Sequence, residues 1–291
     1  MTKRMKIFKS RISWTIYIIC AALFFLYALF PSDMVKEYLA DRIHQTHPNL
    51  TVKMARVRPV IPPGLKLYEV SVFHLGQRIA KLEDLKIAPD ILSLLSATTH
   101  LNFKGDGYGG ILKGGIDITD DSPQRTVVVG ADLAGIQVSR IEVLKSLTTH
   151  KISGSLNATL TFRTNKPDEP LIGHLTLTKG QIEFSTPILK QDSINFDTIE
   201  AELIFNGSSL TIKHCQIDGN LLDADVSGSI KLAGPSARKI LDLSGTVKPH
   251  ETLLVKLGRN VSELIERRNL ENQGIAFKIK GPLDSPNYSF Y

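Results

Sequence analysis

The stretch LDADVSGSIKL, residues 222–232, alternates between apolar or small side chains and polar ones for eleven positions. Its even-numbered residues are apolar or glycine, whereas its odd-numbered residues are Asp, Ser or Lys. The same period of two recurs over residues 154–162, 171–177, 199–205, 241–247 and 275–279. This repeated alternation is typical of an antiparallel sheet with one apolar face and one solvated face. The sequence therefore predicts a mainly β fold with a few helices.

A degenerate unit, apolar–x–Gly–x–apolar, recurs within these segments around Gly154, Gly173, Gly228 and Gly245. A glycine on the apolar side of a strand removes side-chain bulk and eases a bend, so we expect a strongly curved sheet. The apolar face of that sheet is either covered by helices, which we favour, or lines an open groove. The candidate lining residues are Leu156, Leu160, Phe162, Leu175, Val226 and Ile230.

A helix is predicted from Ser32, a candidate N-cap, to about Gln45. Val35, Leu39 and Ile43 recur every four residues, and Met34 and Tyr38 lie beside them, which gives one apolar face. We expect this face to pack on the sheet rather than on a membrane, because the polar face mixes acidic and basic residues instead of being uniformly basic. Further helices are predicted over residues 89–95, 140–147 and 250–268.

The N-terminal region predicts a membrane anchor. Residues 12–32 contain no charged side chain, and a helix of this length spans roughly 32 Å, enough to cross a bilayer core. Five of the first eleven residues are Lys or Arg, so the positive-inside rule assigns residues 1–11 to the cytoplasm. We expect an anchor at 12–31, a juxtamembrane helix at 32–48 and a periplasmic β-rich domain at 49–291. The aromatic anchor residues are Trp14, Tyr17, Phe24, Phe25 and Tyr27.

A cleaved signal peptide is the alternative to an anchor, but its apolar region should span only about 7–15 residues and end at a small-x-small site. The run here is longer and ends on bulky residues, and Cys20 lacks the small residue before it that a lipoprotein site needs. With Cys20 in the anchor, Cys215 has no partner for an intrachain disulfide. Five charges of the net +6 belong to the leader, which removes the main support for nucleic-acid binding.

The sequence shows no convincing constellation for catalysis, cofactor binding or metal binding. The eight histidines are scattered, and neither zinc-site spacing nor a GxSxG nucleophile motif is present. Residues 105–110 match GxGxxG, but a Gly-rich strand follows where a dinucleotide site needs a helix. Asp223 and Asp225 share one strand face, which a solvated surface explains as well as a cation does. We therefore expect a protein that is not an enzyme, with no catalytic, cofactor-binding or metal-binding residues.

The order of these features resembles a known family. After the anchor and helix come PPGLKLYEVSV at 62–72, LEDLKI at 82–87, ILSLL at 91–95, GGILKGG at 109–115 and a closing IKGPLDSP at 279–286. This order resembles the amino-terminal region of AsmA-type proteins and is most similar to the type II secretion system protein N (GspN) family. The resemblance covers nearly the whole chain and implies a single-pass subunit of the bacterial inner membrane, with no catalytic residues.

Two functions follow as expectations. The first, implied by the resemblance, is an accessory or assembly component of type II secretion that binds other subunits, such as the inner-membrane platform or the outer-membrane secretin. The second is an AsmA-like module that binds or transfers lipid, with acyl chains held in an apolar β-groove. A hydrolase comes third because a nucleophile motif is missing.

Overall fold

The computed structural model describes residues 14–15, 17–18, 21–22, 24–25, 27–61, 63–93, 96–121, 124–147, 150–164, 169–188, 191–232, 239–253, 274–283 and 285–291. Fifteen strands of this part form one antiparallel sheet with few helices, as the alternating sequence predicts. The first eight are β1 (Leu50–Lys53), β2 (Arg56–Val60), β3 (Gly64–His74), β4 (Gln77–Pro89), β5 (Thr98–Gly107), β6 (Gly110–Asp121), β7 (Gln124–Gln137) and β8 (Lys151–Arg163). The others are β9 (Leu171–Ile188), β10 (Gln191–Phe205), β11 (Ser209–Gly219), β12 (Leu222–Lys231), β13 (Ile240–Pro249), β14 (Ile275–Pro282) and β15 (Asn287–Phe290).

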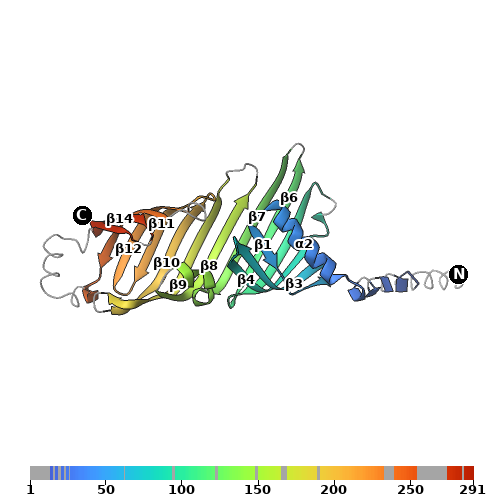
Figure 1. Ribbon diagram of the computed structural model, residues 1–291, viewed down its shortest axis with the longest axis horizontal. Helices are drawn as coiled ribbons and strands as arrows, with labels where there is room; N and C mark the ends of the chain where they lie inside the picture. Colours follow the sequence, from blue (N-terminus) through green and yellow to red (C-terminus); the bar gives the residue numbers. More distant parts are fainter. Residues whose placement is uncertain are drawn as a thin grey trace, which may run out of the picture.

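From β3 onward each strand pairs with the next in the chain, while β1 and β2 both pair with β3. Because every strand from β3 onward pairs with the next strand of the chain, the sheet extends in one direction as the chain proceeds. The strands β3 and β14 consequently lie toward opposite ends of the long axis (Figure 1).

The register joins apolar positions of successive strands into one line across the sheet, here called the inner file. Its members lie directly opposite one another, strand after strand, from β2 to β15. They are Val57, Leu67, Leu85, Gly105, Leu112, Leu133, Ala158, Leu175, Ala201, Cys215, Val226, Gly245, Phe277 and Phe290. Since directly opposite residues point to the same face of a sheet, a single apolar face continues from one end to the other.

The first helix, α2 (Ser32–Thr46), covers the beginning of this face. Its Val35 and Leu39 pack, together with Phe30, against a buried cluster of Met54, Val57, Leu67 and Val70. The predicted packing of this helix on the sheet is therefore confirmed, and its closing Thr46 lies one residue beyond the predicted end.

Two details of the predicted helix were wrong. Met34 and Tyr38 are 72% and 63% exposed, because the sheet contacts only the narrower stripe that contains Val35 and Leu39. Ser32 is the first helical residue rather than the N-cap, which is Pro31 without a side-chain cap. The Ser32 hydroxyl instead lies 2.7 Å from the Val57 carbonyl oxygen and 3.3 Å from its N–H.

The remaining predicted helices were found in part. Residues 138–147 form a 3₁₀ turn, η2 (Val138–Arg140), and a short helix, α3 (Glu142–Leu147). The helix predicted at 89–95 begins too early because Pro89 ends β4, and residues 94–95 lie outside the described part. Residues 251–253 are helical, whereas 254–268 of the third predicted helix lie outside the described residues.

Only part of the predicted anchor, residues 12–31, is described. Trp14, Tyr17, Phe24, Phe25 and Tyr27 all belong to helical turns and are more than half exposed. Within the described part of the chain, no helix combines the length and the apolar character needed to cross a membrane.

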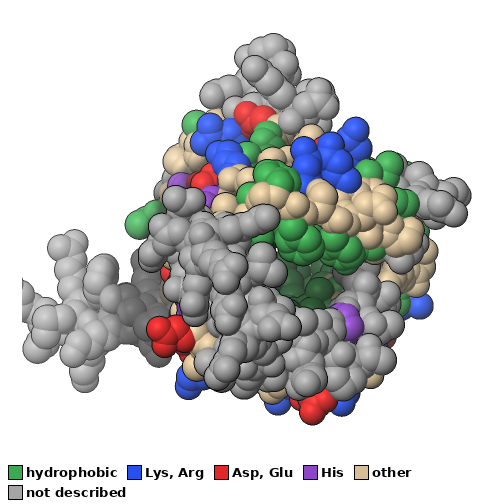
Figure 2. Space-filling view, turned by 90° about the vertical axis from the view of Figure 1, so that its left-hand side faces the viewer, with side chains coloured by type: hydrophobic (Ala, Val, Ile, Leu, Met, Phe, Trp, Pro, Cys, Tyr) green, Lys and Arg blue, Asp and Glu red, His purple; other side chains and the backbone are tan. Residues whose placement is uncertain are grey.

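Seen along the long axis from the C-terminal side, this end of the molecule is hollowed (Figure 2). The wall of the hollow that is in view carries hydrophobic side chains (Figure 2). The hollow and the inner file make the apolar face of the sheet the candidate binding surface.

Candidate functional site

The structure brings all six predicted lining residues onto the apolar face that carries the inner file. Leu175 and Val226 are members of the inner file. The other four lie on the same side of their strands, each directly opposite an apolar residue or a glycine of an adjacent strand. The pairs are Leu156 with Leu177, Leu160 with Gly173, Phe162 with Val129, and Ile230 with Leu210.

Burial differs along this face. Under α2 the file is closed, since Val57 is fully buried and Leu67 is 5% exposed. Farther along, the six lining residues are only half-buried, as are Leu203 and Leu243. The apolar face is therefore sealed at the α2 end and remains partly accessible over the later strands.

The four predicted glycines also lie on this face. Gly173, Gly228 and Gly245 each face apolar residues across both neighbouring strands. Gly154 and Gly228 have φ angles of 138° and 139°, which L side chains rarely adopt. A Cβ on Gly228 would lie 2.2 Å from the Asp242 carbonyl oxygen, so only glycine fits the backbone there.

Cys215, which the sequence reasoning treated only as an unpaired thiol, lies in the middle of the inner file between Ala201 and Val226. Burial raises the pKa of its thiol, and the negative charge of Asp225 raises it further. A raised pKa keeps the thiol protonated and slow to react. Cys215 and Ile217 are two residues apart, so their side chains lie on the same face of a strand. This spacing in the sequence could have placed Cys215 on the apolar face.

The opposite face carries a line of cations, here called the outer basic file, which sequence reasoning missed. Arg58, Lys66, Lys86, Lys104 and Lys113 lie directly opposite one another on β2 to β6. Lys66 forms an ion pair with Asp84 at 2.8 Å, and this hydrogen bond raises the pKa of Lys66. Like charges directly opposite one another destabilise a sheet, and the ion pair of Lys66 with Asp84 and the position of Asp132 opposite Lys113 offset part of this repulsion.

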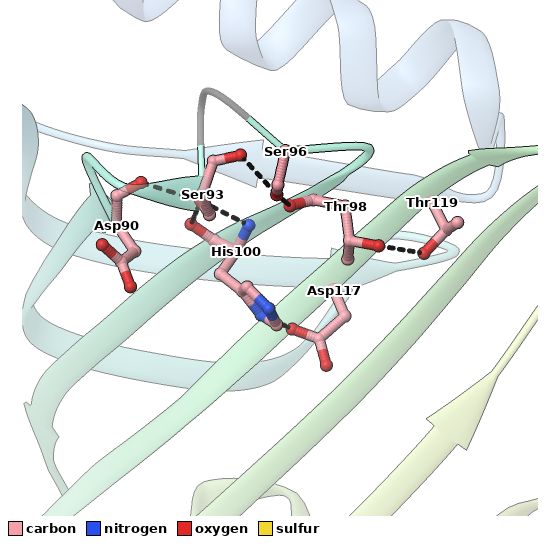
Figure 3. Close-up of polar contacts among 7 residues, drawn as sticks. All are labelled: Asp90, Ser93, Ser96, Thr98, His100, Asp117 and Thr119. Carbon is pink, nitrogen blue, oxygen red and sulfur yellow. Dashed lines mark hydrogen bonds and ion pairs between the residues drawn. The ribbon is translucent and has the colours of Figure 1, made fainter.

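Ser, His and Asp residues meet at the connection between β4 and β5 (Figure 3). The buried Ser93 hydroxyl donates to the Asp90 carbonyl oxygen at 2.7 Å and accepts from the backbone N–H of His100 at 2.9 Å. The His100 ring contacts Asp117 on the adjacent strand. Because Ser93 contacts the backbone of His100 and not its ring, this arrangement lacks the hydroxyl–imidazole bond of a catalytic triad. The cluster closes the connection onto the sheet.

The GxGxxG segment forms a β-hairpin. β5 ends at Gly107 and β6 begins at Gly110, with Tyr108 and Gly109 at positive φ in the turn. The glycines therefore serve a tight turn between strands rather than a strand-to-helix turn. Asp223 pairs with His250 at 2.9 Å, and the described residues contain no group of three potential metal ligands.

No protein-family model, curated protein or solved structure matches the chain.

Proposed function

We propose that this protein binds acyl chains of lipids along its inner file and acts as a lipid-binding or lipid-transfer module. The observation that carries the proposal is the unbroken apolar line across β2 to β15, which is half-buried from β9 to β14. Fourteen residues separated by inter-strand spacings of about 4.8 Å make a line of roughly 62 Å. A bilayer core, which holds two layers of acyl chains, is about 30 Å thick.

The physical reason is the cost of leaving this face in water. Each methylene that moves from water to an apolar surface contributes about 0.8 kcal/mol of binding free energy. One acyl chain along the inner file therefore offsets much of the free-energy cost of exposing this face to water. Such a module would be tethered to the bacterial inner membrane by residues 12–31, with its sheet forming a curved, AsmA-like groove in the periplasm. Acyl chains would be its ligand and membrane lipid its source.

The thiol of Cys215 provides a direct test. The only other cysteine, Cys20, lies in the predicted anchor, so a maleimide added to the full chain in detergent reports on Cys215. Loading with phospholipid should slow the labelling of Cys215, and mass spectrometry should find co-purified lipid. A chain that carries no lipid and is labelled at the same rate with or without phospholipid would refute the proposal.

The second candidate, an assembly component of type II secretion, is favoured by the edge of β15, which pairs with no described strand except β14. Tyr288, Phe290 and Tyr291 are 64%, 68% and 75% exposed there. The Tyr291 N–H donates to the Ala276 carbonyl oxygen of β14. Backbone groups of successive residues in a strand point alternately to the two sides, so the N–H and C=O groups of Tyr288 and Phe290 point away from β14. An unpaired edge of this kind can accept a strand of a partner subunit.

Gene deletion separates the two candidates. Loss of secreted enzymes with an intact lipid barrier would favour the assembly role. Normal secretion together with a lipid-permeability defect would favour the lipid role and exclude the assembly role.

A further inference from the structure

A cavity of about 520 Å³ lies where the predicted anchor meets the sheet. Its wall combines three groups of residues. They are Tyr27, Ala28 and Phe30 at the end of the predicted anchor, Ser32 and Asp33 at the start of α2, and residues 55–59, which lead into and form β2. Tyr27 and Phe30 provide an apolar side, and Arg56 and Arg58 provide a basic side.

The charge of this cavity is unbalanced. Arg56 and Arg58 are exposed, and neither forms an ion pair with any residue that the structure describes. Asp33 is the only carboxylate among the described residues of the wall, and it already pairs with Lys36 at 3.1 Å. Arg58 is also the first member of the outer basic file, which extends the positive surface away from the cavity.

The cavity also adjoins the lipid-binding face. Val57 stands between the two arginines, belongs to the wall, and begins the inner file. A ligand in the cavity is therefore next to the anchor on one side and to the closed end of the apolar face on the other. A molecule with both an anionic and an apolar part matches this surrounding.

We propose that the cavity binds the phosphate of an anionic phospholipid headgroup, with Arg56 and Arg58 as its ligands. Guanidinium groups bind phosphate through paired N–H donors, and an aromatic residue such as Tyr27 is suited to headgroup depth. The site rests on the proposed lipid function and adds to it a headgroup preference and a location at the anchor end.

The test uses the full chain in detergent, incubated with vesicles of equal parts phosphatidylglycerol and phosphatidylcholine, followed by mass spectrometry of the bound lipid. The wild type should prefer phosphatidylglycerol, because phosphatidylcholine carries the same phosphate together with a choline cation that the two arginines repel. Arg56→Gln/Arg58→Gln removes both guanidinium groups and should lower that preference at least about tenfold, the effect of losing a single charge-assisted hydrogen bond. The matched control, Lys86→Gln/Lys104→Gln, removes two charges from the same face and should keep the preference.

Equal uptake of both lipids by the wild type, or the same loss in the control, would overturn the headgroup site while leaving the lipid function intact. A wild type that binds neither lipid would instead refute the lipid function itself. Inorganic phosphate should not displace phosphatidylglycerol; full displacement would show a site for free phosphate and also overturn the inference.

Discussion

At the scale of single residues, the pair of His250 and Asp223 joins the chain after β13 to the start of β12. The hydrogen bond to Asp223 raises the pKa of His250 above its ordinary 6.5, although burial opposes the shift. Burial raises the pKa of Asp223, but hydrogen bonds from His250 and the Gly219 N–H outweigh it and lower the pKa below 3.8.

These shifts predict a pH dependence. The contribution of His250 is complete below about pH 6.5 and is lost as the pH rises through its raised pKa. The contribution of Asp223 is complete above about pH 3.8 and is lost as the pH falls through its lowered pKa. The Tm difference between wild type and Asp223→Asn should therefore be largest between these values and shrink above neutrality. Both side chains are more than a third exposed, so the effect is small.

The control for this titration is His74→Gln, at an exposed position at the end of β3. This variant keeps the pair of Asp223 and His250, so it shows how the Tm depends on pH when that pair is present. A Tm difference for Asp223→Asn that stays constant from pH 5 to pH 9, values chosen to bracket the His pKa of about 6.5, would contradict the assignment.

Gly228 supplies a second prediction at this scale. Gly228→Ala forces a Cβ into the Asp242 carbonyl oxygen at an unfavourable φ, so the free energy of unfolding should fall by about 2 kcal/mol or more. Gly130→Ala, where a Cβ meets nothing within 4 Å, should change it by less than about 0.5 kcal/mol or stabilise the protein. Urea unfolding compares the two, and equal losses would be evidence against a special role of the Gly228 backbone.

At the scale of elements, the seating of α2 can be tested by its exposed and covered faces. Leu39 is half-buried and packs against the buried cluster that contains Val57. Leu39→Ala should therefore cost about 1–3 kcal/mol of unfolding free energy, less on average than the roughly 2–5 kcal/mol for a fully buried leucine. Met34→Ala, on the exposed side, should cost less than about 0.5 kcal/mol. If the two substitutions cost the same, α2 does not pack as described.

The comparison of α2 with the strands shows what local patterns reveal. The period of two placed Leu160 and Ile230 on the apolar side correctly, because successive side chains in any strand point to opposite faces. The helical pattern was less exact, since Met34 and Tyr38 are apolar but the sheet meets only one stripe of the helix. The width of a helix contact depends on its partner, which the helix sequence does not contain.

At the scale of the whole molecule, the proposed lipid function depends on continuity of the inner file. Ala201 lies near its middle, between Leu175 and Cys215. Ala201→Lys places a charged side chain in the inner file, and an acyl chain that passes it must displace the water around this charge, which is costly. Lipid transfer between vesicles should therefore slow by about tenfold or more. Fluorescent phospholipid transfer measures the rate.

The control for this substitution is Glu200→Lys, which changes the charge by more but lies on the opposite, exposed face. Its transfer rate should stay near that of the wild type. An unchanged rate in Ala201→Lys would show that lipid does not move along the file.

The sequence by itself determined the strand-rich class, the apolar side of each strand and the glycines on that side, because side-chain alternation is a local property of extended backbone. Only the tertiary structure decided that fourteen strands align their apolar positions into one file and that five cations align on the other face. Register depends on pairing between strands and on bulges, such as the one between Ile212 and Cys215 in β11. The cavity beside Arg56 and Arg58 likewise exists only where α2, the end of the anchor segment and β2 meet.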